Sequence, residues 1–104
     1  MVMFADMDGL KSINDIHGHK AGDNAIRSIA SILQSACTHD EITCRFGGDE
    51  FFIFGVDYNE EKAVALRDKI LHGLEICNRN AGNPYQLSVS LGACITIPPK
   101  NSTI

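Results

Sequence analysis

The sequence has no excess of basic residues, no cysteine pair at metal-binding spacing, and no apolar run long enough to cross a membrane. Nine basic residues stand against 13 acidic ones, giving a net charge of −4, whereas a nucleic-acid surface needs a basic stripe. We therefore expect no nucleic acid polymer as a partner and no direct membrane contact. No signal peptide is visible, so the segment is expected to be cytoplasmic, which leaves a membrane-anchored parent protein open.

The four cysteines lie far apart in the chain, and each falls in an apolar run. This placement favours buried, reduced thiols over disulfides or a zinc site. The chain has 104 residues, of which 44% are hydrophobic and 21% charged, as in an ordinary globular domain. We interpret residues 1–104 as one domain, without repeats or low-complexity segments. The cysteines are Cys37, Cys44, Cys77 and Cys94.

Hydrophobic patterning predicts six elements in the order β-α-β-β-α-β. One helix is predicted from about Gly22, with Asp23 near its start, and a second follows Asn59 as N-cap and breaks at 80–84. This order is typical of the α+β, ferredoxin-like arrangement, an antiparallel sheet with its helices on one face. The predicted strands are 2–5, 42–46, 51–56 and 86–97, the last stopped by Pro98-Pro99.

This topology is expected to bring acidic residues together. The first strand of such a sheet pairs antiparallel with the third, so its exit lies beside the hairpin joining strands two and three. Asp6 and Asp8 end the first strand, while Asp49 and Glu50 occupy the hairpin. We therefore expect four carboxylates to converge at one edge of the sheet. Because clustered acids repel, a hard divalent cation is expected there, and magnesium uses carboxylates together with substrate phosphates.

These segments also match patterns other than a magnesium site. Asp-x-Asp-Gly and Gly-Gly-Asp are also common solvated turns without any ligand. An EF-hand calcium loop over 6–17 fails, because Lys11 replaces its invariant glycine and His17 its bidentate glutamate. His17 and His19 lack a third nearby ligand, which is more typical of a turn than of a transition-metal site.

Three segments, taken in order, resemble the GGDEF family of diguanylate cyclases. Residues 45–51 read Arg-Phe-Gly-Gly-Asp-Glu-Phe and contain the motif that names the family. Residues 6–15 and 18–23 resemble its second signature, and Ser-Val-Ser-Leu-Gly at 88–92 resembles its final core strand. The resemblance covers nearly the whole chain. It implies an enzyme that condenses two GTP molecules into cyclic di-GMP and two pyrophosphates.

The resemblance also implies a metal site and a catalytic group. Asp6, the main-chain carbonyl of Met7, Asp49 and Glu50 would hold Mg²⁺ or Mn²⁺. Asp49 or Glu50 would help to deprotonate the ribose 3′-hydroxyl that attacks the α-phosphate of the partner's GTP.

A GTP-binding set follows from the same resemblance. The amides after Asp6 would bind the terminal phosphates with Lys11, and glycines at the hairpin tip would let the backbone approach the nucleotide closely. Without the resemblance, Asn14 and Asp23 are better read as caps, and Lys11 as a solvated lysine. The implied GTP-binding residues are Lys11, Asn14 and Asp23 (guanine edge), His19, Gly47 and Gly48.

The resemblance implies partners as well. One domain holds one nucleotide, so a symmetric homodimer is needed for a product with two guanosines. A sensory or regulatory domain is expected in a longer parent protein, because the chain reads as truncated at both ends relative to the family. Whether this piece alone is active stays open.

The sequence departs from the family pattern in ways that leave alternatives. Leu10 replaces the usual phenylalanine before the lysine, a change that keeps an apolar contact. Thr38 and Glu41 occupy the positions where many members carry an Arg-x-x-Asp inhibitory site, so weak or absent product feedback is predicted there. A catalytically inactive GTP-binding regulatory module and a different palm-like nucleotidyl transferase both remain as alternative functions.

Overall fold

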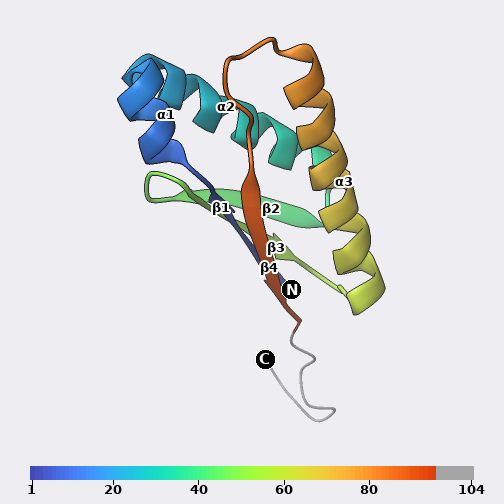
Figure 1. The fold of residues 1–104 in the computed structure, drawn as a ribbon. Helices are drawn as coiled ribbons and strands as arrows, with labels where there is room; N and C mark the ends of the chain where they lie inside the picture. Colours follow the sequence, from blue (N-terminus) through green and yellow to red (C-terminus); the bar gives the residue numbers. More distant parts are fainter. Residues whose placement is uncertain (96–104) are drawn as a thin grey trace.

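The computed structural model describes residues 1–95, whose elements follow the order β-α-α-β-β-α-β (Figure 1). The strands are β1 (Val2–Met7), β2 (Glu41–Phe46), β3 (Glu50–Gly55) and β4 (Val89–Cys94). The helices are α1 (Leu10–His17), α2 (His19–Ala36) and α3 (Glu60–Asn80).

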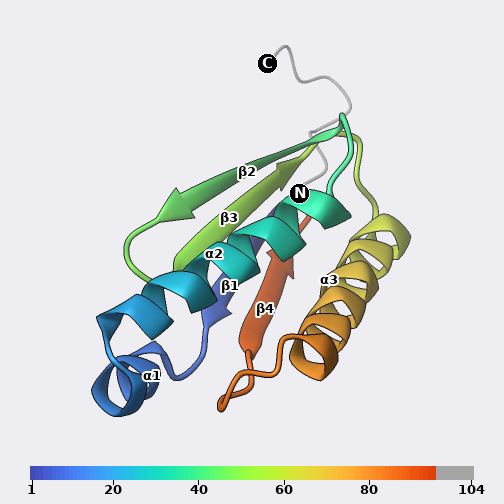
Figure 2. The ribbon, with the colours of Figure 1, turned by 90° about the horizontal axis from the view of Figure 1, so that it is seen from above.

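The four strands form a single antiparallel sheet in the order β2-β3-β1-β4. Strand β1 therefore lies between β3 and β4, and helices α2 and α3 lie together over one face of the sheet (Figure 2). The predicted α+β, ferredoxin-like arrangement is confirmed, including the pairing of the first strand with the third.

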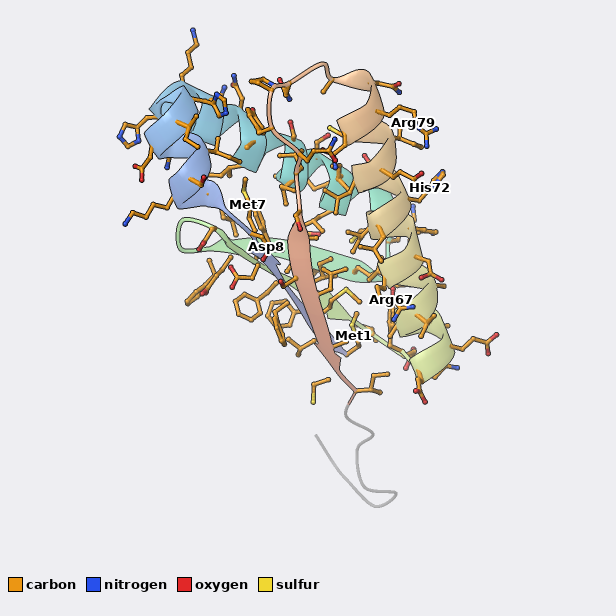
Figure 3. The ribbon with its side chains drawn as sticks, viewed as in Figure 1. Met1, Met7, Asp8, Arg67, His72 and Arg79 are labelled. Atoms are coloured by element: carbon orange, nitrogen blue, oxygen red, sulfur yellow. The ribbon has the colours of Figure 1, made fainter. Side chains whose placement is uncertain are left out.

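The core lies between the sheet and the two long helices. Successive side chains of a strand point to opposite faces, so Met3, Ala5 and Met7 of β1 are buried while Val2 and Phe4 are exposed. Helix α3 follows the same logic at helical spacing, since its apolar stripe faces the sheet while Arg67, His72 and Arg79 lie on its exposed side (Figure 3). Other buried core residues include Ile29, Leu33, Phe51, Ile53, Leu66, Ile70 and Leu74.

Helix α1 was not predicted, and α2 begins earlier than expected. The predicted helix from about Gly22 in fact starts at His19, and residues 10–17 form a separate helix. Gly18, with φ of +94°, separates the two. Only Ile13 is buried in α1, and its eight residues are shorter than the window of roughly 11–18 residues over which helical periodicity is recognised.

The last strand is shorter than predicted: β4 spans Val89–Cys94, not 86–97. The backbone of Leu87 is bonded by the side chain of Asn78 on α3, with distances of 2.7 and 2.9 Å for its N–H and C=O. The side-chain amide of Asn78 thus makes the hydrogen bonds that a neighbouring strand would otherwise make with Leu87. The part of the prediction at Ile97 and Pro98-Pro99 lies outside the described residues.

All four cysteines are free, as predicted, but the expectation that all are buried is wrong. Cys37 and Cys77 are partly buried, whereas Cys44 and Cys94 are exposed. Both exposed thiols lie on the face of the sheet opposite the helices, where strand alternation places them.

Candidate active site

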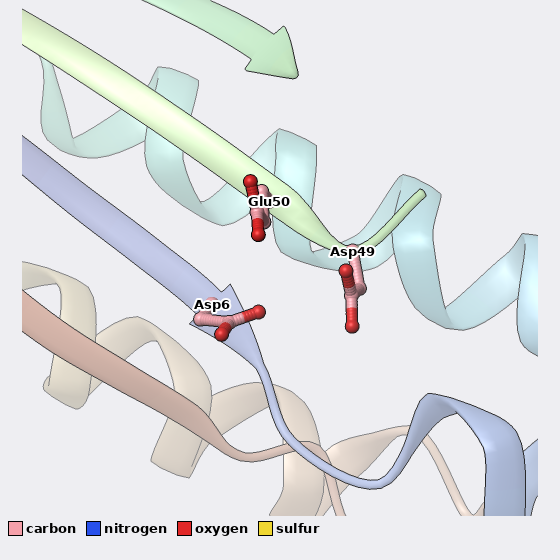
Figure 4. Close-up of side chains that lie close together, drawn as sticks. All are labelled: Asp6, Asp49 and Glu50. Carbon is pink, nitrogen blue, oxygen red and sulfur yellow. The ribbon is translucent and has the colours of Figure 1, made fainter. Parts of the chain in front are cut away.

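Three acidic side chains from β1 and the β2–β3 hairpin lie together at one end of the sheet (Figure 4). Asp6 pairs with Glu50 in the β1–β3 register, and the Met7 N–H donates to the Asp49 carbonyl at 2.8 Å. One carboxylate oxygen from each of Asp6, Asp49 and Glu50 lies within 4.8 Å of the other two. The predicted convergence of these three residues is therefore present. We call them the acid triad.

The hairpin that carries Asp49 depends on its glycines. Gly47 has φ of +79°, in the left-handed region that favours glycine. The Arg45 guanidinium donates to the Gly48 carbonyl at 3.1 Å, which ties the tip to β2 and agrees with a structural role for Arg45. Glu50 follows as the first residue of β3, so its position is set by the strand rather than by the turn.

The acid triad has the chemistry of a site for a hard cation. None of its three side chains is fully buried. The ion pairs formed among residues 1–95, Arg67–Asp68 and Arg79–Glu75, both lie on α3, so no basic side chain in that range compensates the triad. Three uncompensated carboxylates at this spacing offer the oxygen ligands that Mg²⁺ and Mn²⁺ prefer.

Asp8 does not join the triad, contrary to the expectation of four converging carboxylates. Its Oδ2 accepts from the Ser88 hydroxyl at 2.9 Å and its Oδ1 from the Ser90 hydroxyl at 2.8 Å. Its carboxylate therefore turns toward β4, whereas the triad lies on the β3 side of β1. Sequence reasoning missed both serines, although their alternate spacing on a strand beside β1 was a usable signal.

Two of the backbone amides that follow Asp6 already donate hydrogen bonds within the chain. The Met7 N–H donates to Asp49 and the Asp8 N–H donates to the Ser88 carbonyl at 2.9 Å. The predicted phosphate contacts therefore narrow to amides from Gly9 onward, at the start of α1, where no side chain caps the helix. Lys11 is exposed in this first turn, and its place beside the phosphates stays a prediction.

The predicted guanine-binding residues lie on the two helices that follow β1. Asn14 on α1 packs directly against Gly22 of α2, since a Cβ added to Gly22 would come within 1.8 Å of the Asn14 Oδ1. Gly22 thus lets the Asn14 side chain reach the backbone next to Asp23. Both Asp23 and His19 are exposed on α2.

The alternative role of Asp23 as a helix cap is wrong. Gly18 occupies the N-cap position of α2, and no acidic residue lies in the first turn of this helix. Asp23 stands one turn further along, where it satisfies no free backbone amide. Its carboxylate remains available for another partner.

Thr38 and Glu41 are joined by hydrogen bonds. The Thr38 N–H and hydroxyl both donate to Glu41 Oε2 at 2.8 Å, and the Tyr58 hydroxyl donates to Glu41 Oε1. Burial raises the pKa of Glu41, but the bonds from Tyr58 and Thr38 outweigh it, and the net pKa lies below its ordinary value. Burial and then the bond to Glu41 raise the pKa of Tyr58, which stays a donor.

Comparison with known proteins agrees with this fold. Residues 1–104 match the family described as "Diguanylate cyclase, GGDEF domain". The chain belongs to this GGDEF family.

Two curated relatives and one solved structure illustrate the likeness. The chain is 33% identical over 98 residues to the probable diguanylate cyclase DgcT of Escherichia coli, covering 91% of the chain and 22% of DgcT. It is 30% identical over 95 residues to the cyclic di-GMP phosphodiesterase PdeR of the same organism, covering 91% of the chain and 14% of PdeR.

The solved structure is the GGDEF domain of the YfiN (TpbB) protein of Pseudomonas aeruginosa. It has a TM-score of 0.78 and 30% identity, and the match covers 88% of this chain and 58% of that one. The chain therefore spans about a fifth or less of the two curated relatives and little more than half of this solved domain. Among residues 1–95, no helix combines the length and apolar character needed to cross a membrane.

Proposed function

We propose that this chain is the catalytic part of a diguanylate cyclase that condenses two GTP molecules into cyclic di-GMP and two pyrophosphates. The observation that carries the proposal is the acid triad, which gathers three uncompensated carboxylates at one exposed end of the sheet. The triad lies where β1 leads, within three residues, into the uncapped start of α1. The name of the relative DgcT supports the same activity.

The protein's part in the reaction is to bind, orient and move a proton. Asn14 and Asp23 present an amide and a carboxylate that match the amino and imino edge of guanine, so that adenine would leave polar groups unpaired. His19, the first residue of α2, would lie close to the nucleotide. Lys11 and the amides at the start of α1 are the phosphate-binding groups.

At the reacting centre, Asp6, the Met7 carbonyl, Asp49 and Glu50 would hold Mg²⁺ or Mn²⁺. When bound, the cation supplies positive charge that stabilises the reacting phosphate and the leaving pyrophosphate. Asp49 or Glu50 accepts the proton of the ribose 3′-hydroxyl, and Gly47 and Gly48 keep side chains out of the nucleotide's path. The two half-sites belong to two copies of the domain, each acting on the other's α-phosphate.

GTP turnover with magnesium tests this proposal in the complete natural chain beside Asp49→Asn and Glu50→Gln. Each substitution removes one negative charge while keeping the side-chain shape, so we expect cyclic di-GMP formation to fall by roughly 10²-fold or more.

The matched control is Glu61→Gln, an exposed acid of α3 outside the triad. It should retain the parent rate. Turnover by Asp49→Asn and Glu50→Gln at the parent rate would exclude the catalytic assignment, and a different cyclic or polymeric product would indicate another palm-like nucleotidyl transferase.

The second candidate is a GTP-binding regulatory module without turnover. The similarity to PdeR supports it, because that relative is named a phosphodiesterase rather than a cyclase. GTP binding without product, in the presence of an intact triad, would favour this function. In both cases the short coverage of the relatives is consistent with a longer parent protein that carries a regulatory domain.

A further inference from the structure

We propose that Ser88 and Ser90 are positioning residues that hold Asp8 on the β4 side of β1 and thereby fix the acid triad on the β3 side. The inference rests on the cation site of the proposed function. It assigns to Asp8, the second acid of the Asp6-Met7-Asp8 segment, a role outside cation binding.

At the end of β1, two successive backbone amides donate hydrogen bonds to opposite sides of the strand. The Met7 amide donates to Asp49 on the β3 side, and the next amide, that of Asp8, donates to Ser88 on the β4 side. The side chains follow the same division, since Asp6 lies with Asp49 and Glu50 while the Asp8 carboxylate is bonded to both serine hydroxyls.

Without the serines, Asp8 would compete with the triad. Asp8 lies two residues after Asp6, just past the end of β1, and two residues of extended chain span roughly 7 Å. A flexible carboxylate at that distance can turn toward Asp6, where it would repel the triad or take a cation out of place. Ser88 and Ser90 each occupy one Asp8 oxygen in a charge-assisted bond, which holds this carboxylate away.

The bonds also fix the strand end itself. The Asp8 side chain and amide together make three bonds, two to Ser88 just before β4 and one to Ser90 in β4, at 2.9, 2.9 and 2.8 Å. These anchor the residue that directly follows the Met7 carbonyl and the Asp6 carboxylate. Groups that orient a metal ligand from behind contribute to affinity although they never touch the metal.

The test compares two double variants of equal shape in the complete natural chain. Ser88→Thr/Ser90→Thr keeps both hydroxyls, whereas Ser88→Val/Ser90→Val replaces each hydroxyl with a methyl group. Both serines are exposed and threonine and valine both suit strands, so both variants are expected to fold. The probe is Mn²⁺ alone, with free Mn²⁺ measured by electron paramagnetic resonance and binding at the triad checked with Asp6→Asn.

We expect the valine pair to bind Mn²⁺ roughly tenfold more weakly than the threonine pair, the lower end of the loss seen when outer-shell partners are removed. In an Asp8→Ala background the two pairs should bind equally, because the serines act through Asp8. Equal affinities in the parent background, a difference that persists in Asp8→Ala, or Mn²⁺ binding that does not need Asp6 would each overturn the inference.

Cyclic di-GMP formation, measured separately, distinguishes the two proposals. If the parent chain makes no product but the threonine and valine pairs differ in Mn²⁺ affinity, the positioning role is supported and the proposed function is excluded. If the parent chain makes product but the two pairs bind Mn²⁺ equally, the proposed function is supported and the positioning role is excluded.

Discussion

Gly47 and Gly48 are neighbours at the hairpin tip, yet they meet different requirements. Gly47 has φ of +79°, which any side chain would strain, at a cost of roughly 1–2 kcal/mol. Gly48 lacks a positive φ, and no atom lies within 4 Å of a Cβ added there. The protein itself therefore has room for a methyl group at Gly48, and any demand for glycine at this residue comes from a ligand.

The Gly48→Ala substitution tests whether a bound nucleotide requires glycine at this position. We expect stability to change by no more than about 0.5 kcal/mol, whereas GTP affinity falls by roughly tenfold because a methyl group forced into a close contact costs about 1–3 kcal/mol. Urea unfolding and GTP titration measure the two effects. Gly47→Ala is the comparison, since it should lose stability as well, and unchanged GTP affinity in Gly48→Ala would show that the nucleotide does not approach this backbone.

Between elements, the bonds among Thr38, Glu41 and Tyr58 join the end of α2 to the start of β2 and to the segment before α3. Both oxygens of Glu41 accept bonds from within the chain. The lowered pKa of Glu41 means that the fold favours its carboxylate form. This contribution to stability is present above the ordinary pKa of 4.5 and is lost as the pH falls through the lowered value.

Tyr58→Phe removes the main donor to Glu41. We expect a stability loss of roughly 0.5–1 kcal/mol at neutral pH, after allowing for solvent screening, and a smaller loss at a pH below the lowered pKa of Glu41, where its carboxyl group is protonated. Urea unfolding at the two pH values measures this. Tyr85→Phe is the matched control, because its hydroxyl donates to the neutral carbonyl of Ala21 and its loss should not depend on pH. Equal pH dependence in both variants would contradict the assignment.

The same bonds bear on product inhibition. With Glu41 occupied by Tyr58 and Thr38, and without the arginine of an Arg-x-x-Asp site, residues 38–41 offer little to an anionic dinucleotide. We expect added cyclic di-GMP to leave the initial rate of GTP turnover unchanged through this segment. Inhibition that disappears in Thr38→Ala/Glu41→Ala would refute this prediction.

For the molecule as a whole, the acid triad lies at one end of the sheet, and none of its three side chains is fully buried. One chain supplies one triad, whereas the product of the proposed reaction would contain two guanosines joined twice. Activity should therefore require two domains, each correctly oriented toward the other.

The rate of cyclic di-GMP formation is accordingly expected to rise with roughly the square of protein concentration below the dimer dissociation constant. Specific activity measured over a dilution series tests this. Adding excess Asp49→Asn protein should lower the rate by drawing active chains into mixed pairs. A specific activity that stays constant on dilution to the monomeric state would exclude a two-chain mechanism.

Much of the architecture followed from local patterns. The strands β1 and β3, the glycine-containing hairpin between β2 and β3, and the Asn59 cap, whose Oδ1 accepts from the Lys62 amide at 2.8 Å, all appear as expected. Helix α1 did not, because it buries a single residue. The last strand begins later than predicted because the side chain of Asn78, nine residues earlier in the chain, bonds the backbone of Leu87.

Strand order and hairpin position were enough to bring Asp6 to Asp49 and Glu50, since pairing β1 with β3 leaves few other places for these residues. Local patterns could not show which way Asp8 would turn. Its two hydroxyl partners lie 80 and 82 residues further along the chain, on the opposite neighbour of β1. A carboxylate between two strands turns toward whichever offers donors, and here the folded sheet places those donors on β4.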